Sequence, residues 1–445
     1  MLVSLLQCTA VVVRLSRPPM MVANPPSVAL PGRPDATDEA EFMADPRGFC
    51  SSRMPTDGAV FATGAFDNAI FAGSTKVIDA ATEAGECVDL GQHQLREPFR
   101  ELVASAPDGK TAFETICASF NDECYAGFFQ WVPLFKETGG FSTFRFEDFI
   151  DPRVRKALPG LRRVIFRATA PTLLGSKLED LPTSPGLESP KDWGKAYAEY
   201  AAEKMKPASP SFPLLFKLPT IGGGGPSLET ALGAEKAGEV LSVVEPTAAL
   251  VASMLRMVQA YPDWDTRLAD EQKRALSGSK PESPIDSKIL GDMPSLEAFA
   301  LETLRMYPPS RPSQLRLTRK IDVDGMELPA GAIVAPEPFV GHFVPSLYER
   351  PDSFNPDRFM GAEIPAPSMG FPGYGGVRGN TSRDLILSLA KVAFVQMRRM
   401  HEVKLPTELP NVAGYPLHSI PDSVELKAVP YMYYELQRGV RKLRF

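Results

Sequence analysis

The sequence predicts a mainly α-helical protein with small β-sheets, and three observations support this prediction. Apolar residues recur with helical spacing in residues 235–261 and again in 295–307. Residues 321–339 instead carry short apolar runs separated by Asp-Gly and by Pro-Ala-Gly, which is the pattern of a strand, a turn and a second strand. Proline is abundant, with 44 residues among 445, and this favours many short connections between elements.

The first 34 residues differ in composition from the rest of the chain. They contain no Asp or Glu, carry the arginines Arg14, Arg17 and Arg33, and open with an apolar run of 13 residues. We expect a leader that directs the protein to an organelle, a plastid or a mitochondrion; the competing interpretation is a disordered N-terminus. The run is too short for a comfortable membrane span, and no later segment has 18 consecutive apolar residues, so we expect no transmembrane helix.

Residues 35–445 are expected to form one domain. Short apolar runs broken by glycine in residues 59–81 predict a small hairpin followed by a helix. Residues 95–201 are mainly helical in pattern. Residues 171–228 are rich in proline and glycine, including the run Gly222–Gly225, and we expect an irregular flap or linker there. The glycine run lacks the Gly-Lys-Ser/Thr of a phosphate-binding loop.

The segment 235–261 is apolar on nearly all sides, which predicts a helix through the middle of the protein, and Pro246 is expected to kink it. The helix over 295–307 should end before Pro308 and Pro309. The strand pair of 321–339 follows it along the chain.

Charge and cysteine content exclude several classes of function. A formal net charge of −6 gives no reason to expect nucleic-acid binding. All five cysteines lie within the first 124 residues and none forms a Cys-x-x-Cys pair, so we expect neither a disulfide framework nor a metal site. No cysteine follows Cys124.

Three charged residues carry a motif. Glu302 and Arg305 stand three residues apart on one helix face, and Arg358 lies in the turn-rich segment 350–361. In this order and spacing they resemble the cytochrome P450 superfamily of heme-thiolate proteins, in its Glu-x-x-Arg helix and its Pro-Glu-Arg-Phe segment. The resemblance implies the cytochrome P450 fold and a buried triad of Glu302, Arg305 and Arg358.

Other positions match the family in register. The resemblance assigns heme-propionate contacts, should heme be retained, to four residues: His93, Arg96, Arg316 and Arg378. Glu245 and Thr247 resemble the acid and threonine of the family's oxygen-binding helix. Residues 336–361 are similar to plant allene oxide synthases and hydroperoxide lyases, and residues 243–252 to bacterial fatty-acid peroxygenases. The latter carry an arginine where this chain has Glu245, and a carboxylate there would repel a fatty acid.

The glycine-rich segment 373–384 resembles the family's heme loop, with Arg378 in register and Asn380 at the position of the cysteine ligand. A thiolate anchors the iron and promotes cleavage of the O–O bond, which a carboxamide does not do. Two other interpretations of the segment are weaker: a dinucleotide-binding turn lacks the required spacing, and Asn380-Thr381-Ser382 is a common chance sequon. His401 and His418 are poorly placed to replace the cysteine.

The sequence therefore predicts a non-catalytic relative of the cytochromes P450, without a catalytic residue and without a bound cofactor. Its role would be structural, as a subunit of an organelle complex, or the binding of a lipid or other apolar ligand. The alternative is a heme-dependent oxidoreductase or monooxygenase, or an enzyme that rearranges fatty-acid hydroperoxides, with an unusual iron site in which Glu245 and Thr247 handle protons.

Overall fold

The structure is a computed structural model of the chain. It describes residues 34–53, 60–88, 120, 154–176, 178–181, 187–204, 228–279, 283–309, 314–345, 347–361, 380–406, 420 and 422–430. Residues 1–33, which the sequence assigns to a leader, lie outside these ranges.

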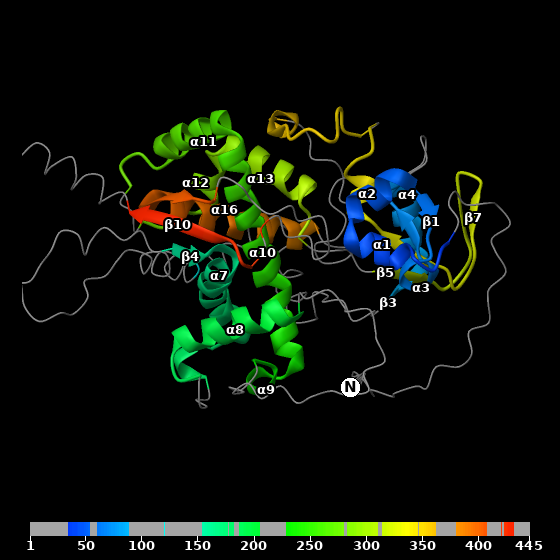
Figure 1. The fold of residues 1–445 in the computed structure, drawn as a ribbon, viewed down its shortest axis with the longest axis horizontal. Coiled ribbons are helices and arrows are strands. Elements are labelled where there is room, and N and C mark those ends of the chain that lie inside the picture. The colour runs from blue at the N-terminus through cyan, green and yellow to red at the C-terminus, as the bar shows by residue number, and fades with distance from the viewer. Residues whose placement is uncertain are drawn as a thin grey trace, which may run out of the picture.

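Helices dominate the described residues (Figure 1). The α-helices are α1 Asp38–Ala44, α2 Pro46–Arg53, α3 Ala65–Asn68, α4 Thr75–Ala84, α7 Ala157–Leu174, α8 Pro190–Lys204, α9 Leu228–Leu232, α10 Ala234–Ala260, α11 Pro262–Ala275, α12 Ser287–Gly291, α13 Pro294–Met306, α14 Pro338–Gly341 and α16 Asn380–Met400. Two 3-10 helices are η3 Leu178–Asp180 and η4 Pro356–Phe359. The mainly helical fold class predicted from the sequence is confirmed.

The strands form three small sheets. They are β1 Val60–Ala62, β2 Ile70–Ala72, β3 Gly85–Val88, β4 Val154–Lys156, β5 Gln314–Leu317, β6 Ile321–Val323, β7 Met326–Leu328, β8 Ile333–Pro336, β9 His401–Lys404 and β10 Glu425–Pro430. The sheet orders are β1-β2-β8-β5-β3, β4-β10-β9 and β6-β7. The β2–β8 pair is parallel and the other pairs are antiparallel.

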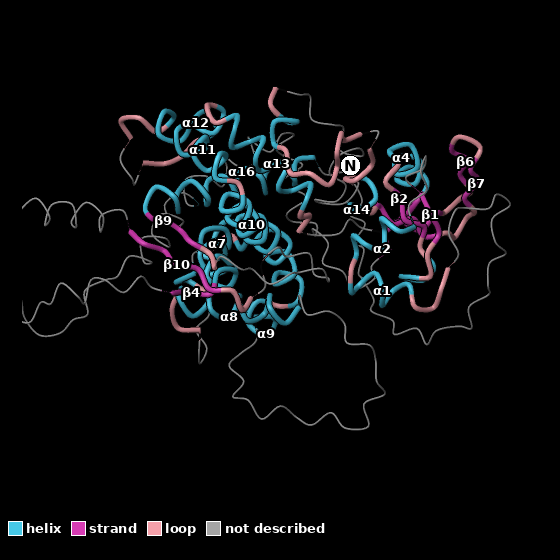
Figure 2. The backbone as a smooth tube through the Cα atoms, turned by 45° about the horizontal axis from the view of Figure 1, so that its top comes forward, coloured by secondary structure: helices cyan, strands magenta, loops and turns pink. Residues whose placement is uncertain are grey.

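The five-stranded sheet separates two apolar cores. Side chains alternate between the two faces of a strand, and in β8 this places Val334 in a small core with α4, while Ile333 and Ala335 belong to the large core of the protein. We call the face of Ile333 and Ala335 the inner face. Figures 1 and 2 show α1 to α4 and this sheet at one end of the molecule and the long helices at the other.

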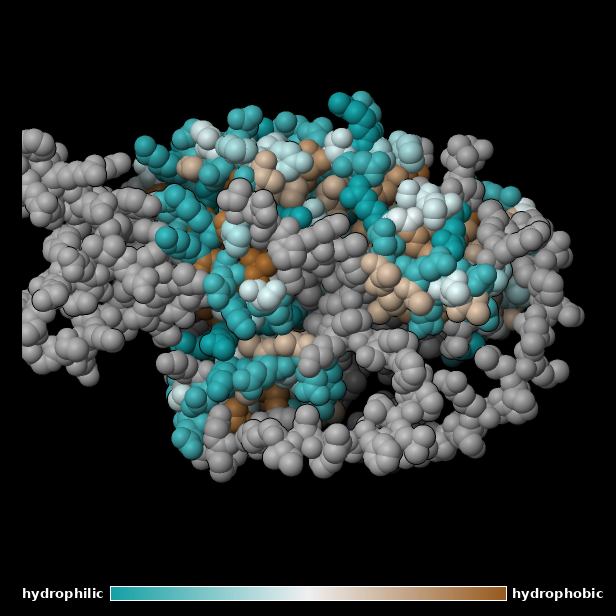
Figure 3. All heavy atoms as spheres, in the orientation of Figure 1, coloured by the Kyte–Doolittle hydropathy of each residue, from teal (hydrophilic) through white to brown (hydrophobic). Residues whose placement is uncertain are grey.

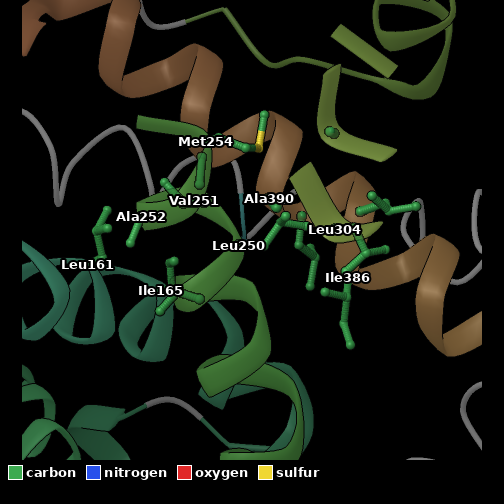
Figure 4. Packing of buried hydrophobic residues seen from close by; sticks show 14 of the residues in the cluster. Leu161, Ile165, Leu250, Val251, Ala252, Met254, Leu304, Ile386 and Ala390 are labelled. Atoms are coloured by element: carbon green, nitrogen blue, oxygen red, sulfur yellow. The ribbon is translucent and has the colours of Figure 1, made fainter. Parts of the chain in front are cut away.

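Helix α10 is the centre of the helical part, as its apolar pattern predicted. It packs against α7, α13 and α16. In Figure 4, Leu161 and Ile165 of α7 lie on one side of Val251 and Ala252, while Leu304 of α13 approaches Ile386 of α16 on the other side. Burial of a large aliphatic side chain stabilises the fold by roughly 1.5–3 kcal/mol, so this helix fixes the positions of its neighbours.

Two local predictions agree with the structure. In residues 59–81, β1 and β2 pair antiparallel around the short helix α3 and are followed by α4. In residues 321–339, β6 and β7 form a hairpin whose central residues Asp324 and Gly325 have φ of 53° and 81°. Asp-Gly is the sequence that a turn with two positive φ angles requires, because glycine has no Cβ to clash.

The structure differs from the sequence-based expectation inside residues 171–228. A regular helix, α8, occupies Pro190–Lys204, where an irregular flap was expected. Proline at the first helical position and the alanines and aromatic residues that follow favour a helix there, and Trp193 and Tyr197 are buried against α7. The surrounding prolines and glycines had hidden this signal.

One helix in the described ranges is long and apolar enough to cross a bilayer, Lys236–Ala260 in α10. Its most apolar window is 89% buried inside the protein, so it is the core helix of the fold and gives no clear transmembrane segment. On the face drawn in Figure 3, hydrophilic residues cover most of the described surface.

Candidate functional site

Glu302, Arg305 and Arg358 lie together, and we call them the Glu302 network. Glu302 and Arg305 are side by side on α13 and both side chains are fully buried. Arg305 donates from Nε to Glu302 Oε2 at 2.7 Å and from Nη2 to Oε1 at 2.8 Å. Arg358 in η4 brings its Nε to 3.2 Å from the same carboxylate, with 11% of its side chain exposed. One carboxylate thus holds two guanidinium groups.

Main-chain oxygens satisfy the remaining donors of the network. Arg305 Nη1 donates to the carbonyls of His342 at 2.9 Å and Pro351 at 2.8 Å. The main-chain N–H of Asn355 donates to Glu302 Oε1 at 2.8 Å. A buried charge is costly unless it is paired and hydrogen-bonded, and here the bonds also fasten residues 342–358 onto α13.

His342 lies against this network. Its Nδ1 is 3.0 Å from the carbonyl oxygen of Arg305. Burial lowers its pKa to about 3, against an opposing effect of that hydrogen bond, and the positive charge of Arg305 lowers it further. The imidazole is therefore neutral at physiological pH, with Nδ1–H as the donor to Arg305.

Glu245 and Thr247 both lie on α10, on either side of Pro246, and both are buried. The Thr247 hydroxyl donates to the carbonyl of Val243 at 2.8 Å. The Glu245 carboxylate is engaged through both oxygens by Arg162 of α7, whose Nη2 and Nε donate to it at 2.6 and 2.8 Å. The acid of the predicted pair is thus bound to a cation from a neighbouring helix.

Arg162 joins Glu245 to the C-terminal part of the chain. Its Nη1 donates to both carboxylate oxygens of Asp422 at 2.7 Å. The Arg162 side chain is 0% exposed, Glu245 3% and Asp422 40%. Burial alone would lower the pKa of Arg162, but the two carboxylates outweigh it and raise that pKa, so the guanidinium stays charged. We call these three residues the Arg162 network.

The sequence did not predict Arg162 or Asp422. The usable signal was Glu245 itself, since an acid in a helix that is apolar on all sides needs a buried partner. Tyr197 of α8 adds to this site: it is fully buried, stacks on Phe166 at 4.8 Å, and its hydroxyl has no hydrogen-bond partner among the described residues. Burial first, and then the charge of Glu245, raise its pKa well above the usual value.

The residues assigned to the heme propionates are only partly described. His93, Arg96 and Arg378 lie outside the described residues. Arg316 is exposed on β5, where its Nη1 is 3.5 Å from the carbonyl of Gly331. Asn380 is the first residue of α16. In the described part of the chain, no group of three or more His, Cys, Asp or Glu residues is suited to hold a metal ion.

Comparisons with known proteins identify the class. The cytochrome P450 family model matches residues 242–376, which contain α13, η4 and most of α10. A solved structure, "Retinoic acid bound cyanobacterial CYP120A1", has the same fold, with a TM-score of 0.60, 18% identity and coverage of 90% of this chain and 100% of that chain. The chain has the cytochrome P450 fold, and the matches support the cytochrome P450 superfamily.

Curated relatives share a shorter segment. Cyclooctat-9-en-7-ol 5-monooxygenase of Streptomyces melanosporofaciens is 30% identical over 144 residues, which is 30% of this chain and 30% of that protein. Cytochrome P450 26A1 of Gallus gallus is 29% identical over 210 residues, 45% of this chain and 42% of that protein. The chain thus spans less than half the length of these relatives.

These matches correct one expectation. The sequence predicted no cofactor because the cysteine ligand is missing, but the family-model match and the cytochrome P450 fold point to heme. The prediction weighed one ligand against a whole scaffold. Among the described residues, Arg316 fits the group, because an exposed guanidinium on the inner face suits a propionate carboxylate. The thiolate does not fit, since no cysteine follows Cys124.

Proposed function

We propose that this chain is a heme-binding protein of the cytochrome P450 fold that does not carry out thiolate-dependent oxygen activation. One observation carries the proposal: α16 begins at Asn380, the residue that stands at the family's cysteine position. A cysteine thiolate supplies the electron density that favours O–O cleavage when heme is bound. Asparagine has no charge to donate and is a weak ligand for ferric iron.

The state of Glu245 supports the same proposal. Proton transfer to or from a reacting group needs a side chain within hydrogen-bond reach of it. Glu245 directs both carboxylate oxygens to Arg162, and the Thr247 hydroxyl donates back to its own helix. Both side chains therefore act in the described structure as parts of the scaffold.

We further propose that the fold is retained to bind an apolar ligand, such as a lipid, or to serve as a structural subunit of a complex in a plastid or mitochondrion. The supporting observations are the intact Glu302 network and the extensively apolar core around α10. A protein that kept only a surface for partners would not need a heme-side scaffold with every buried charge paired.

The competing proposal is a heme-dependent monooxygenase or a hydroperoxide-rearranging enzyme. It is supported by the name of the Streptomyces relative, a monooxygenase. It requires an iron ligand other than a cysteine of the loop 373–384, and a proton-handling residue other than Glu245 in its described state.

The absorption spectrum of the full-length protein separates the two proposals. With heme bound, we expect a Soret band that does not shift to the thiolate position after reduction and treatment with carbon monoxide. Asn380→Cys should gain that shift, and the matched control Asn380→Ser should not. A thiolate-type band in the unaltered protein would refute the proposal, as would turnover of a hydroperoxide at rates above those of free hemin.

A further inference from the structure

The inner face of the five-stranded sheet is apolar except at β5. In that strand Leu315 and Leu317 pack in the small core with α4. Because side chains alternate along a strand, Gln314 and Arg316 lie on the inner face. Arg316 is paired in register with Ile333 of β8, and extending that register places Gln314 beside Ala335. Ile333 and Ala335 are both part of the large core.

Gln314 is an unusual residue at this position. It is 2% exposed, and neither its amide nitrogen nor its amide oxygen has a hydrogen-bond partner among the described residues. Native proteins pair nearly all buried polar side-chain atoms, so a buried amide with two unpaired atoms indicates a partner from outside the chain. Its neighbour Arg316 is exposed; the two therefore form a buried neutral position and an exposed cationic position on one strand.

The chemistry of the amide limits what that partner can be. A glutamine side chain has an N–H donor and a carbonyl acceptor. A carboxylate has no donor and would leave the carbonyl of Gln314 unpaired, whereas a hydroxyl group both accepts and donates. An anionic group is better served by Arg316, two residues along the strand. The buried position suits an uncharged hydroxyl.

We propose that Gln314 binds the hydroxyl group of an apolar alcohol held between the inner face and the helical part of the protein. This inference rests on the apolar-ligand role proposed above and specifies its ligand class. The apolar part of the molecule would lie against side chains such as Ile333 and Ala335, which are 4% and 1% exposed. The hydroxyl would accept from the amide N–H and donate to the amide oxygen.

Three probes of equal chain length test the proposal on the full-length protein: 1-dodecanol, dodecane and dodecanoate, each displacing a fluorescent apolar dye. We expect dodecanol to bind about tenfold more tightly than dodecane, the effect of one buried hydrogen bond, and more tightly than dodecanoate. Gln314→Leu should abolish this preference and leave the affinity for dodecane unchanged. Gln272→Leu in α11 is the matched control, a buried glutamine whose Nε2 also lacks a partner among the described residues.

The melting temperature without ligand gives a second measurement. If Gln314 is reserved for a ligand, Gln314→Leu removes an unpaired polar group and the melting temperature should not fall; a fall would indicate a structural partner and overturn the proposal. Gln314→Met replaces the leucine variant if that variant does not fold. Equal binding of dodecanol and dodecane would overturn this inference alone. Failure of every probe to bind would overturn the apolar-ligand role, and this inference with it.

Discussion

The Glu302 network and the Arg162 network are both buried groups of three charges, with opposite composition. In the first, one carboxylate holds two guanidinium groups; in the second, one guanidinium holds two carboxylates. The extra cation of the first network binds main-chain carbonyls. The extra anion of the second, Asp422, is 40% exposed and solvated. The first network is thus completed by backbone, and the second by water.

This difference decides which residue of each network is essential. Glu302 is the shared partner of two arginines, so its loss leaves two unpaired cations, one of them fully buried. Arg162 is the shared partner of two acids, so its loss leaves one buried carboxylate, because Asp422 still has water. We therefore expect four effects of decreasing size.

The largest effect is expected for Glu302→Gln. It removes the charge that pairs both arginines, and breaking a buried ion pair from one side costs about 3–5 kcal/mol. The loss is measured as a decrease in the free energy of unfolding in urea. Glu199→Gln is the control, because its pair with Lys195 is exposed at 63% and 68%. A loss below about 1 kcal/mol for Glu302→Gln, the range of surface pairs, would contradict this prediction.

The second effect is expected for Arg162→Met. Glu245 would be left buried without its cation, at a cost of about 3 kcal/mol. The double variant Arg162→Met with Glu245→Met should recover most of that loss, because apolar side chains of similar volume often replace a buried pair without cost. If the double variant is as unstable as the single one, the pair contributes packing geometry that methionines do not reproduce, and its comparison with the Glu302 network fails.

The third effect is a pH dependence that belongs to the Glu302 side only. The pKa of His342 is about 3 in the folded protein and near 6.5 when the chain is unfolded. Between these values the unfolded state binds the proton, so stability is complete above pH 6.5 and falls by about 1.4 kcal/mol per pH unit below it. From pH 6.5 to 5 this amounts to about 2 kcal/mol.

His342→Gln should remove this pH dependence, since the amide can still donate to the Arg305 carbonyl but does not titrate. The measurement is the free energy of unfolding of both proteins across pH 5 to 7.5. Parallel curves for the two proteins would show that His342 does not contribute to the acid sensitivity.

The smallest effect is expected for Asp422→Asn, about 0.5 kcal/mol, because the carboxylate is 40% exposed and its interaction is screened by water and salt. Added salt should reduce the difference between the two proteins. A loss as large as that of Arg162→Met would mean that Asp422 is as essential as Glu245 to the network.

Much of the fold could be predicted from local patterns. The spacing of Glu302 and Arg305 placed both on one face, and Asp324-Gly325 announced its hairpin turn. The helix α8 was missed because the breakers around it dominated the composition of residues 171–228. The absence of cofactor was the wrong conclusion from a correct observation: one missing ligand said little about a scaffold shared with heme proteins.

The sequence alone determined the helical periodicities, the motif of Glu302, Arg305 and Arg358, and the lack of any cysteine beyond Cys124. These are properties of spacing and composition, which are local along the chain. Tertiary structure decided that Glu245 binds Arg162, 83 residues away, and that Gln314 lies buried on the inner face without a partner among the described residues. No local rule contains these facts, because which distant groups meet depends on how helices and sheets pack.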